Sequence, residues 1–165
     1  MTDLCLNLGC DQWKLSGFTN IDLNPEVNPD LVLDLNSLTD SYEHNTVDFI
    51  YAGHILEHLI YEESLGVMKQ CYQILKPHRT LLAVVPDYVK SINEPIEVAE
   101  KIVLANGDHR MLMSGKRLER MLAEAGFQIV TELTNLLQNP YLIVSDRNNP
   151  VADPWQSAFL AMKLP

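Results

Sequence analysis

Carboxylate side chains recur where short apolar segments of this sequence end. Asp22, Asp34 and Asp87 come directly after such segments, and Asp11 comes two residues after Gly9. An ionised carboxylate accepts hydrogen bonds on both oxygens, so one can hold the two hydroxyls of a ribose and another an adenine amine. Each aspartate taken singly is also a common turn or capping residue. Several in register predict a site for an adenosine compound beside Gly9.

The turn at Gly9 limits which adenosine compound fits. A dinucleotide motif needs three glycines and an acidic residue about 20 positions later, whereas here one glycine is followed by Asp22 after 13 positions. A Walker phosphate loop is absent, and Lys14 is the one cation near the turn. These features favour a cofactor without phosphates. S-adenosylmethionine fits, because an acidic pocket suits its ammonium and sulfonium groups.

A second pattern of reactive residues begins at His54. The run from His54 to His58, with Glu57 between them, matches H-x-x-E-H, in which two histidines bind zinc and the glutamate acts as a base. In that motif the histidines lie within a helix, whereas His54 follows a strand, and no third ligand stands out. We therefore predict no metal, and a metallohydrolase is the least favoured alternative.

The elements that must position these residues alternate along the chain. Six strands are predicted, over residues 4–8, 18–23, 31–33, 47–52, 80–85 and 127–133. Helices are predicted over residues 55–75, 96–105 and 114–125. A seventh strand lies at 141–145 or at 155–162, and the second is preferred. This alternation predicts an α/β, Rossmann-like fold with a mostly parallel sheet, helices on both faces and ligands at the carboxyl ends of the strands.

Composition restricts the class of partner. The chain has 165 residues and a formal net charge of −10, which predicts one domain over residues 1–165. Nucleic-acid binders cluster Lys and Arg, but the best cluster here, Lys116, Arg117 and Arg120, is typical of a solvated helix face. The apolar runs are too short to span a bilayer. We expect a cytoplasmic monomer or homodimer that binds neither nucleic acid nor membrane.

Five ordered segments resemble the class I S-adenosylmethionine-dependent methyltransferases, in particular their short, mostly uncharacterised bacterial members. They are Leu6-Asn7-Leu8-Gly9-Cys10, Asn20-Ile21-Asp22-Leu23-Asn24, Val32-Leu33-Asp34-Leu35, the segment 47–59 and Leu75-Lys76-Pro77. The segments His109-Arg110 and 122–127 extend the resemblance, which covers residues 4–133. It implies a seven-stranded sheet of order 3-2-1-4-5-7-6 with the last strand antiparallel.

The resemblance also implies roles for particular residues. Gly9 would line the methionine part of the cofactor, Asp22 would hold the ribose, and Asp34 with the Leu35 amide would recognise the adenine. Gly53 and the next residue would lie near the methyl group. The full set implied for cofactor binding is Asn7, Gly9, Cys10, Asp11, Asp22, Leu23, Asp34, Leu35, Gly53 and His54.

The first loop departs from the family pattern. Asn7 stands at its usual acidic position, and Asp11 and Trp13 stand where the second and third glycines are expected. Asp11 tolerates a left-handed turn and can supply a carboxylate for the cofactor ammonium. It can instead crowd the site, which leaves a second hypothesis open: a catalytically degenerate methyltransferase fold that serves as a binding or scaffold protein.

The acceptor side is expected to come from residues 87–115, which follow the fifth strand. This small cover favours a small-molecule acceptor over a polymer. His54, His58 and His109 are candidate catalytic residues, because an imidazole can take a proton from a hydroxyl or amine. Packing explains His58 equally well, and alignment without a base can contribute roughly 7–11 kcal/mol at best.

Overall fold

A computed structural model describes residues 3–133 and 155–165 of the chain. Its strands are β1 (Cys5–Leu8), β2 (Thr19–Asp22), β3 (Leu31–Val32), β4 (Val47–Gly53), β5 (Leu75–Pro86), β6 (Gln128–Glu132) and β7 (Gln156–Met162). Its α-helices are α1 (Leu38–Ser41), α2 (Tyr61–Ile74), α3 (Tyr88–Ser91), α4 (Ile96–Leu104) and α5 (Gly115–Glu124). Its 3-10 helices are η1 (Pro25–Val27), η2 (Leu35–Ser37), η3 (Leu56–His58) and η4 (Ala105–Gly107).

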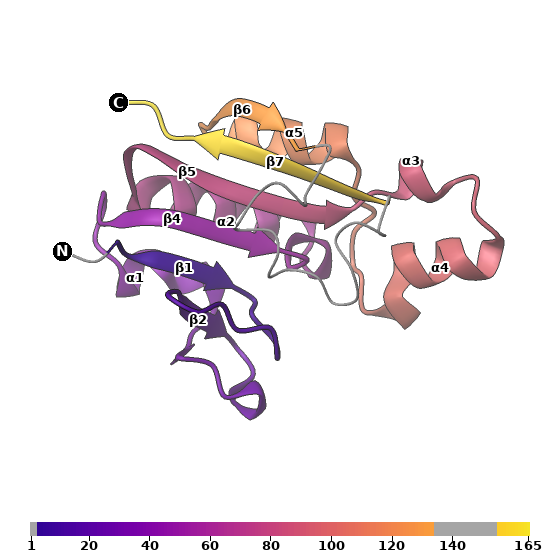
Figure 1. Ribbon diagram of the computed structural model, residues 1–165, viewed down its shortest axis with the longest axis horizontal. Coiled ribbons are helices and arrows are strands. Elements are labelled where there is room, and N and C mark those ends of the chain that lie inside the picture. Colours follow the sequence, from indigo (N-terminus) through magenta and orange to yellow (C-terminus); the bar gives the residue numbers. More distant parts are fainter. Residues whose placement is uncertain (1–2, 134–154) are drawn as a thin grey trace.

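The strands form one sheet in the order β3-β2-β1-β4-β5-β7-β6, as predicted (Figure 1). The strands from β1 to β5 pair in parallel, and β7 runs antiparallel between β5 and β6. Thr80 of β5 pairs with Met162, and Pro86 pairs with Gln156. The preferred position of the seventh strand is therefore confirmed, while the rival segment 141–145 lies outside the described residues.

The two faces of the sheet are covered differently. Side chains alternate along β5, so that Leu81 and Ala83 join the large core with α1, α2 and α5, while Leu82 and Val84 join a smaller cluster on the other face. That cluster includes Leu15 from the loop after β1. Within the described part of the chain, the loop between β1 and β2 contains no helix, so loop residues help to cover this second face.

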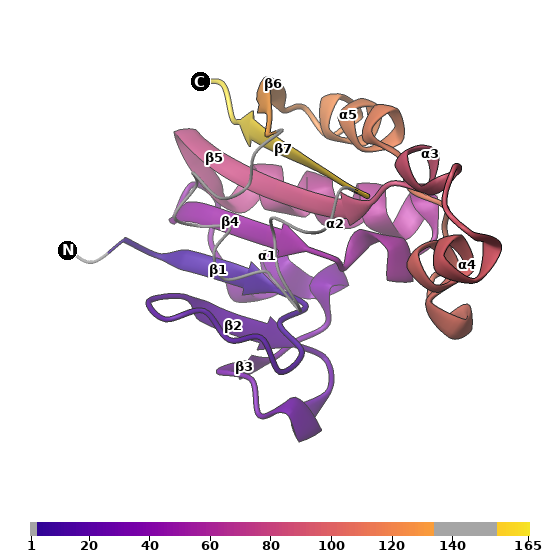
Figure 2. The same ribbon diagram turned by 45° about the vertical axis from the view of Figure 1, so that its right-hand side comes forward.

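The carboxyl ends of β4 and β5 point toward the segment that carries α3 and α4 (Figures 1 and 2). These two short helices lie beyond the edge of the sheet rather than on either face. None of the helices in the described ranges is long and apolar enough to cross a bilayer.

One predicted helix, residues 55–75, is interrupted. The structure has η3, then extended backbone at Leu59 and Ile60, and then α2. The carbonyl of Glu57 accepts hydrogen bonds from the amides of Arg110 (2.8 Å) and Met111 (3.2 Å). A carbonyl used in this way cannot continue the helical ladder, and periodicity within the segment does not contain this long-range contact.

The fifth strand also begins earlier than predicted, at Leu75 instead of residue 80. Leu75 pairs with Val47 and Thr80 pairs with Phe49, so the residues between them loop out of the register. Lys76 in this loop lies 2.7 Å from Asp48, whose carboxylate also accepts the Leu4 amide. The ion pair anchors a bulge that the local sequence pattern did not predict.

Candidate functional site

The turn after β1 has a conformation that favours glycine. Gly9 has a φ of +63°, and a Cβ atom there would lie 2.5 Å from the Ile55 side chain. The loop after β1 is thus in close contact with the loop after β4. The next residue, Cys10, is buried, and burial followed by the charge of Asp22 raises the pKa of its thiol to about 11. This thiol stays protonated at neutral pH and is not a nucleophile.

Asp22 lies beside this turn, as the sequence predicted. Its Oδ2 accepts the Asp11 amide at 2.8 Å, and its Oδ1 accepts the Asn24 amide at 2.9 Å. Asp11 itself has a φ of +46°, so the left-handed conformation that glycine usually supplies is adopted by aspartate here. Each oxygen of Asp22 retains a further lone pair, which leaves the carboxylate able to accept two hydroxyls.

Asp34 lies two residues after the end of β3, the strand next to β2. Its Oδ1 accepts the Asn36 amide at 2.9 Å and so caps η2, which is the structural role that an aspartate at a strand end commonly has. The side chain of Leu35 is half-buried in the same turn. Leu23 is 65% exposed. Each of the two carboxylates, Asp22 and Asp34, is thus followed directly by a leucine that is at least partly exposed.

Asn7 is buried at the end of β1 and serves the loop that follows. Its Nδ2 donates to the Trp13 carbonyl (3.0 Å) and to Asn20 Oδ1 (2.9 Å). Asn20 Oδ1 also accepts the Leu15 amide, while its Nδ2 donates to Asp30. Both amide hydrogens of Asn7 are therefore used within the protein. Sequence reasoning missed Asn20, because its amide network joins segments that no local pattern connects.

Trp13 contributes one unusual atom. Its indole Nε1 is buried and makes no hydrogen bond with any residue in the described ranges. A buried indole N–H usually has an acceptor. This donor in the loop between β1 and β2 therefore has no acceptor among the described residues.

The loop after β4 brings Gly53 and His54 to the same edge. A Cβ atom at Gly53 would collide with the Tyr51 hydroxyl, so any other residue there would displace the Tyr51 side chain. His54 has a φ of +54°, and its amide donates to the Val84 carbonyl at 2.9 Å. Its Nδ1 lies 3.2 Å from Glu57 Oε1. The unusual backbone therefore points this imidazole back toward η3.

Glu57 is the centre of the histidine cluster, although it was not among the predicted site residues. Its side chain is fully buried, and neither oxygen makes a hydrogen bond of good geometry with the described residues. His109 Nε2 lies 4.0 Å from Oε1, and the His58 and His109 rings meet edge to face at 4.9 Å. The three predicted histidines thus surround one glutamate, whose place in the H-x-x-E-H spacing was the available signal.

Burial and charge affect this cluster in opposite directions. Burial acts to raise the pKa of Glu57, but His54, the Glu57 amide and His58 together outweigh it and hold the pKa below its usual value. Burial lowers the pKa of His109 against the opposing charge of Glu57. At neutral pH the glutamate is therefore ionised and the His109 imidazole is neutral.

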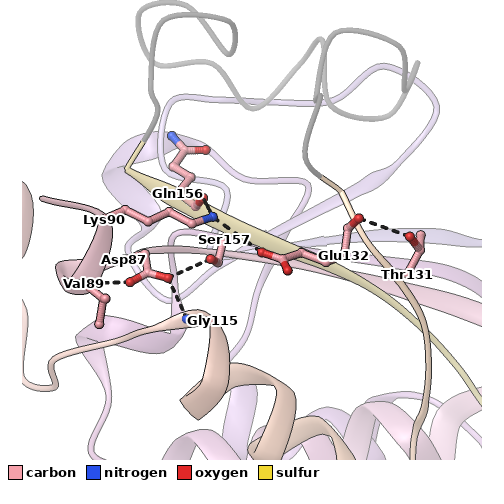
Figure 3. Close-up of polar contacts among 8 residues, drawn as sticks. All are labelled: Asp87, Val89, Lys90, Gly115, Thr131, Glu132, Gln156 and Ser157. Carbon is pink, nitrogen blue, oxygen red and sulfur yellow. Dashed lines mark hydrogen bonds and ion pairs between the residues drawn. The ribbon is translucent and has the colours of Figure 1, made fainter.

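Asp87 follows β5 and has a different function (Figure 3). Its Oδ1 accepts the Val89 amide at 2.9 Å, and its Oδ2 accepts the Gly115 amide at 2.7 Å and the Ser157 hydroxyl at 2.8 Å. Lys90 donates to the Gln156 carbonyl nearby. Asp87 therefore anchors both ends of the segment 87–115 to the sheet and is not part of the site beside Gly9.

Known proteins with a similar fold include methyltransferases. A family model described as a methyltransferase domain matches residues 4–132. No curated protein matches the sequence. Solved structures described as S-adenosylmethionine-dependent methyltransferases are similar over almost the whole chain, and they include proteins of Archaeoglobus fulgidus, Methanosarcina mazei and Mesorhizobium loti.

The three structures share little sequence with this chain. The Archaeoglobus protein has a TM-score of 0.71 at 15% identity, with 98% of this chain and 86% of that chain covered. The Methanosarcina protein has a TM-score of 0.70 at 17% identity, covering 99% and 94%. The Mesorhizobium protein has a TM-score of 0.66 at 15% identity, covering 98% and 91%. They establish the fold of this chain.

Proposed function

Because this chain belongs to the methyltransferase-domain family, we propose that it transfers a methyl group from S-adenosylmethionine to a small molecule at the carboxyl edge of the sheet. The observation that carries the proposal is the Asp22 carboxylate, held beside the Gly9 turn by the Asp11 amide at 2.8 Å. A carboxylate at this position supports the proposal, because it can accept ribose hydroxyls beside a turn whose backbone can approach a ligand closely.

The residues around this turn fit the cofactor. Asp22 has lone pairs left for two hydroxyls, and the turn at Gly9 has no side chain on the α-carbon. Asp11 lies next to Cys10 in the same loop and adds a negative charge suited to an ammonium group.

The adenine and methyl ends are assigned to the neighbouring loops. Asp34 and the Leu35 amide would recognise the adenine, while the exposed Leu23 side chain would pack against its ring. Gly53 and His54, at the end of β4, would lie nearest the methyl group. Asn7 would act indirectly, because its amide positions the loop that contains Trp13.

The cofactor supplies an electrophilic methyl group on a cationic sulfur. The chain must align an acceptor with it and exclude water, which together can account for much of the rate. The segment 87–115, anchored by Asp87 at both ends, would cover the acceptor. His109 is neutral at pH 7 and can accept a proton, and His54 and His58 are the other candidate bases.

The size of the cover supports a small molecule as the acceptor. It contains two short helices, α3 and α4, at the edge of the sheet. Such a cover offers little surface to a polymer. We propose a polar acceptor, because the cover carries Glu94, Glu97 and Glu100.

Calorimetric titration with S-adenosylhomocysteine tests the proposal. We expect one binding site per chain, and Asp22→Asn is expected to weaken binding roughly 10-fold or more, because a charged acceptor is lost. Glu119→Gln, on the exposed face of α5, serves as the charge-matched control and should bind as the wild type does. Equal affinity in the Asp22 variant would refute the assigned ribose site.

Asp11 supports a second candidate function, a catalytically degenerate scaffold. Its φ of +46° shows that the turn is kept without the glycine, but its side chain adds bulk and charge beside Asp22. The scaffold hypothesis predicts no cofactor binding by the wild type and recovery in Asp11→Gly. The methyltransferase hypothesis predicts binding by the wild type and no such gain.

A further inference from the structure

A buried carboxylate whose oxygens make no hydrogen bond of good geometry requires an explanation. Glu57 is fully buried in η3, and neither of its oxygens makes a hydrogen bond of good geometry with a residue of the described ranges. An ionised group in such a place is strongly unfavourable unless a cation or several donors compensate it. The His54 imidazole, 3.2 Å from Oε1, offers one contact.

The two other histidines of the cluster are oriented as metal ligands usually are. His58 Nδ1 lies 3.2 Å from the Asp108 carbonyl, and His109 Nδ1 lies 2.9 Å from the Val103 carbonyl. A carbonyl oxygen only accepts, so the hydrogen is assigned to Nδ1 in both rings, and each Nε2 keeps its lone pair. A histidine that ligates a metal typically donates its other ring N–H to a backbone carbonyl in this way.

We propose that Glu57, His58 and His109 bind a divalent first-row transition-metal ion. One donor atom from each side chain lies within 4.8 Å of the others. Tetrahedral zinc with nitrogen and oxygen ligands has donor atoms about 3.4 Å apart, so the side chains must close inward by about an ångström. Two imidazoles and one carboxylate suit zinc, cobalt or nickel, whereas magnesium and calcium prefer oxygen ligands.

The folded chain supplies the third metal ligand that the sequence pattern lacked. A zinc site at H-x-x-E-H was set aside because no third ligand stood out, but the chain brings His109 to this position from 51 residues beyond His58. The amide of Arg110 donates to the Glu57 carbonyl at 2.8 Å and fixes the two segments together. In the H-x-x-E-H motif the first histidine, here His54, would be a metal ligand. In this fold His109 has that role, and His54 contacts and orients Glu57.

The metal would join two parts of the acceptor side. Glu57 and His58 follow β4, whereas His109 lies at the end of the cover formed by residues 87–115. Three protein ligands leave at least one coordination position for water or for an oxygen of a bound molecule. The site does not depend on methyl transfer, so its presence can be tested separately from the proposed function.

Titration of metal-free protein with cobalt and zinc tests the site. We expect one equivalent of Co²⁺ to bind with visible absorption bands, zinc to displace it, and magnesium not to do so. His58→Gln and His109→Gln should each weaken zinc binding roughly 10-fold or more. His44→Gln, on an exposed histidine, is the matched control and should bind as the wild type does.

Two outcomes would overturn the proposal. One is the absence of stoichiometric cobalt or zinc binding by the folded wild-type chain. The other is an unchanged zinc affinity in both His58→Gln and His109→Gln, with folding checked by circular dichroism. If one variant fails to fold, the other variant and the titration of the wild type still test whether the metal site exists. Cofactor binding is measured in parallel, so loss of metal binding alone leaves the methyltransferase proposal intact.

Discussion

Two acidic side chains at the same edge of the sheet are treated differently by the fold. Asp87 is buried, and its carboxylate accepts three hydrogen bonds, from Val89, Gly115 and Ser157. Glu57 is buried more completely and accepts none of good geometry from the described residues. A carboxylate whose bonds are satisfied internally stabilises the fold. A buried carboxylate whose oxygens can still accept hydrogen bonds or bind a cation marks a place where a ligand can bind.

The largest effect is expected for Asp87→Ala. This change leaves the Gly115 amide and the Ser157 hydroxyl without their acceptor, so we expect the free energy of unfolding to fall by about 3 kcal/mol. Urea denaturation measures the change. Asp87→Asn keeps one acceptor oxygen and should recover part of the loss. A loss below about 1 kcal/mol in Asp87→Ala would show that the hydrogen bonds matter little.

Asp48 tests the same principle at the opposite end of β4. The hydrogen bond from Lys76, followed by that from the Leu4 amide, holds the pKa of Asp48 below its ordinary value. This contribution is therefore complete above the unfolded pKa of about 3.9 and is lost as the pH falls through the lower folded value. Asp48→Asn should cost about 1–2 kcal/mol at pH 7, because Lys76 and Arg79 are half-exposed.

The pH dependence separates this charge effect from a packing effect. Stability of the wild type should decrease below about pH 4 more steeply than that of Asp48→Asn, as measured by urea denaturation at several pH values. Parallel curves for the two proteins would contradict the assigned pKa shift.

Asp34→Ala should have a smaller effect on stability. Its carboxylate caps a single turn of 3-10 helix, so we expect a loss of about 1 kcal/mol in urea denaturation. Asp34→Ser retains a capping oxygen and should restore stability without restoring a charged acceptor. If the serine variant regains stability but not S-adenosylhomocysteine affinity, the cap and the proposed adenine contact are separate roles of one side chain.

The smallest effect is expected for Glu57→Gln in metal-free protein. Glutamine has the same shape and carries no charge, so the substitution leaves no ionised carboxylate buried in η3. We expect the free energy of unfolding to change by less than about 1 kcal/mol. A loss as large as that of Asp87→Ala would reverse the comparison and make Glu57 a structural residue. Thermal denaturation of the two variants side by side provides the measurement.

Much of the fold could be predicted from the sequence because its signals are local. Short apolar segments ended by turn residues located the strands, and the predicted helix over residues 114–125 contains α5. The break at Leu59 and the early start of β5 depend on contacts with distant residues, namely the Arg110 amide and the Asp48 carboxylate. Periodicity along a segment contains no information about such partners.

The candidate site likewise has residues that local sequence patterns predict and residues that only the fold brings together. Gly9 and Asp11 lie in the turn after β1 and Asp22 is the last residue of β2, so the three are close together because neighbouring parallel strands end at one edge. Glu57 and His109 are neighbours only because the cover folds back onto the loop after β4. The histidine pattern identified the relevant residues, but the third member of the cluster required the fold.

The place of β7 has a consequence for synthesis. This strand pairs with β5 and β6, both of which leave the ribosome before it does. Until residues 156–162 are made, the facing edges of β5 and β6 offer unpaired amides and carbonyls to any neighbouring chain. The nascent protein therefore passes through a stage that is prone to association, which ends only when its last strand inserts between two earlier ones.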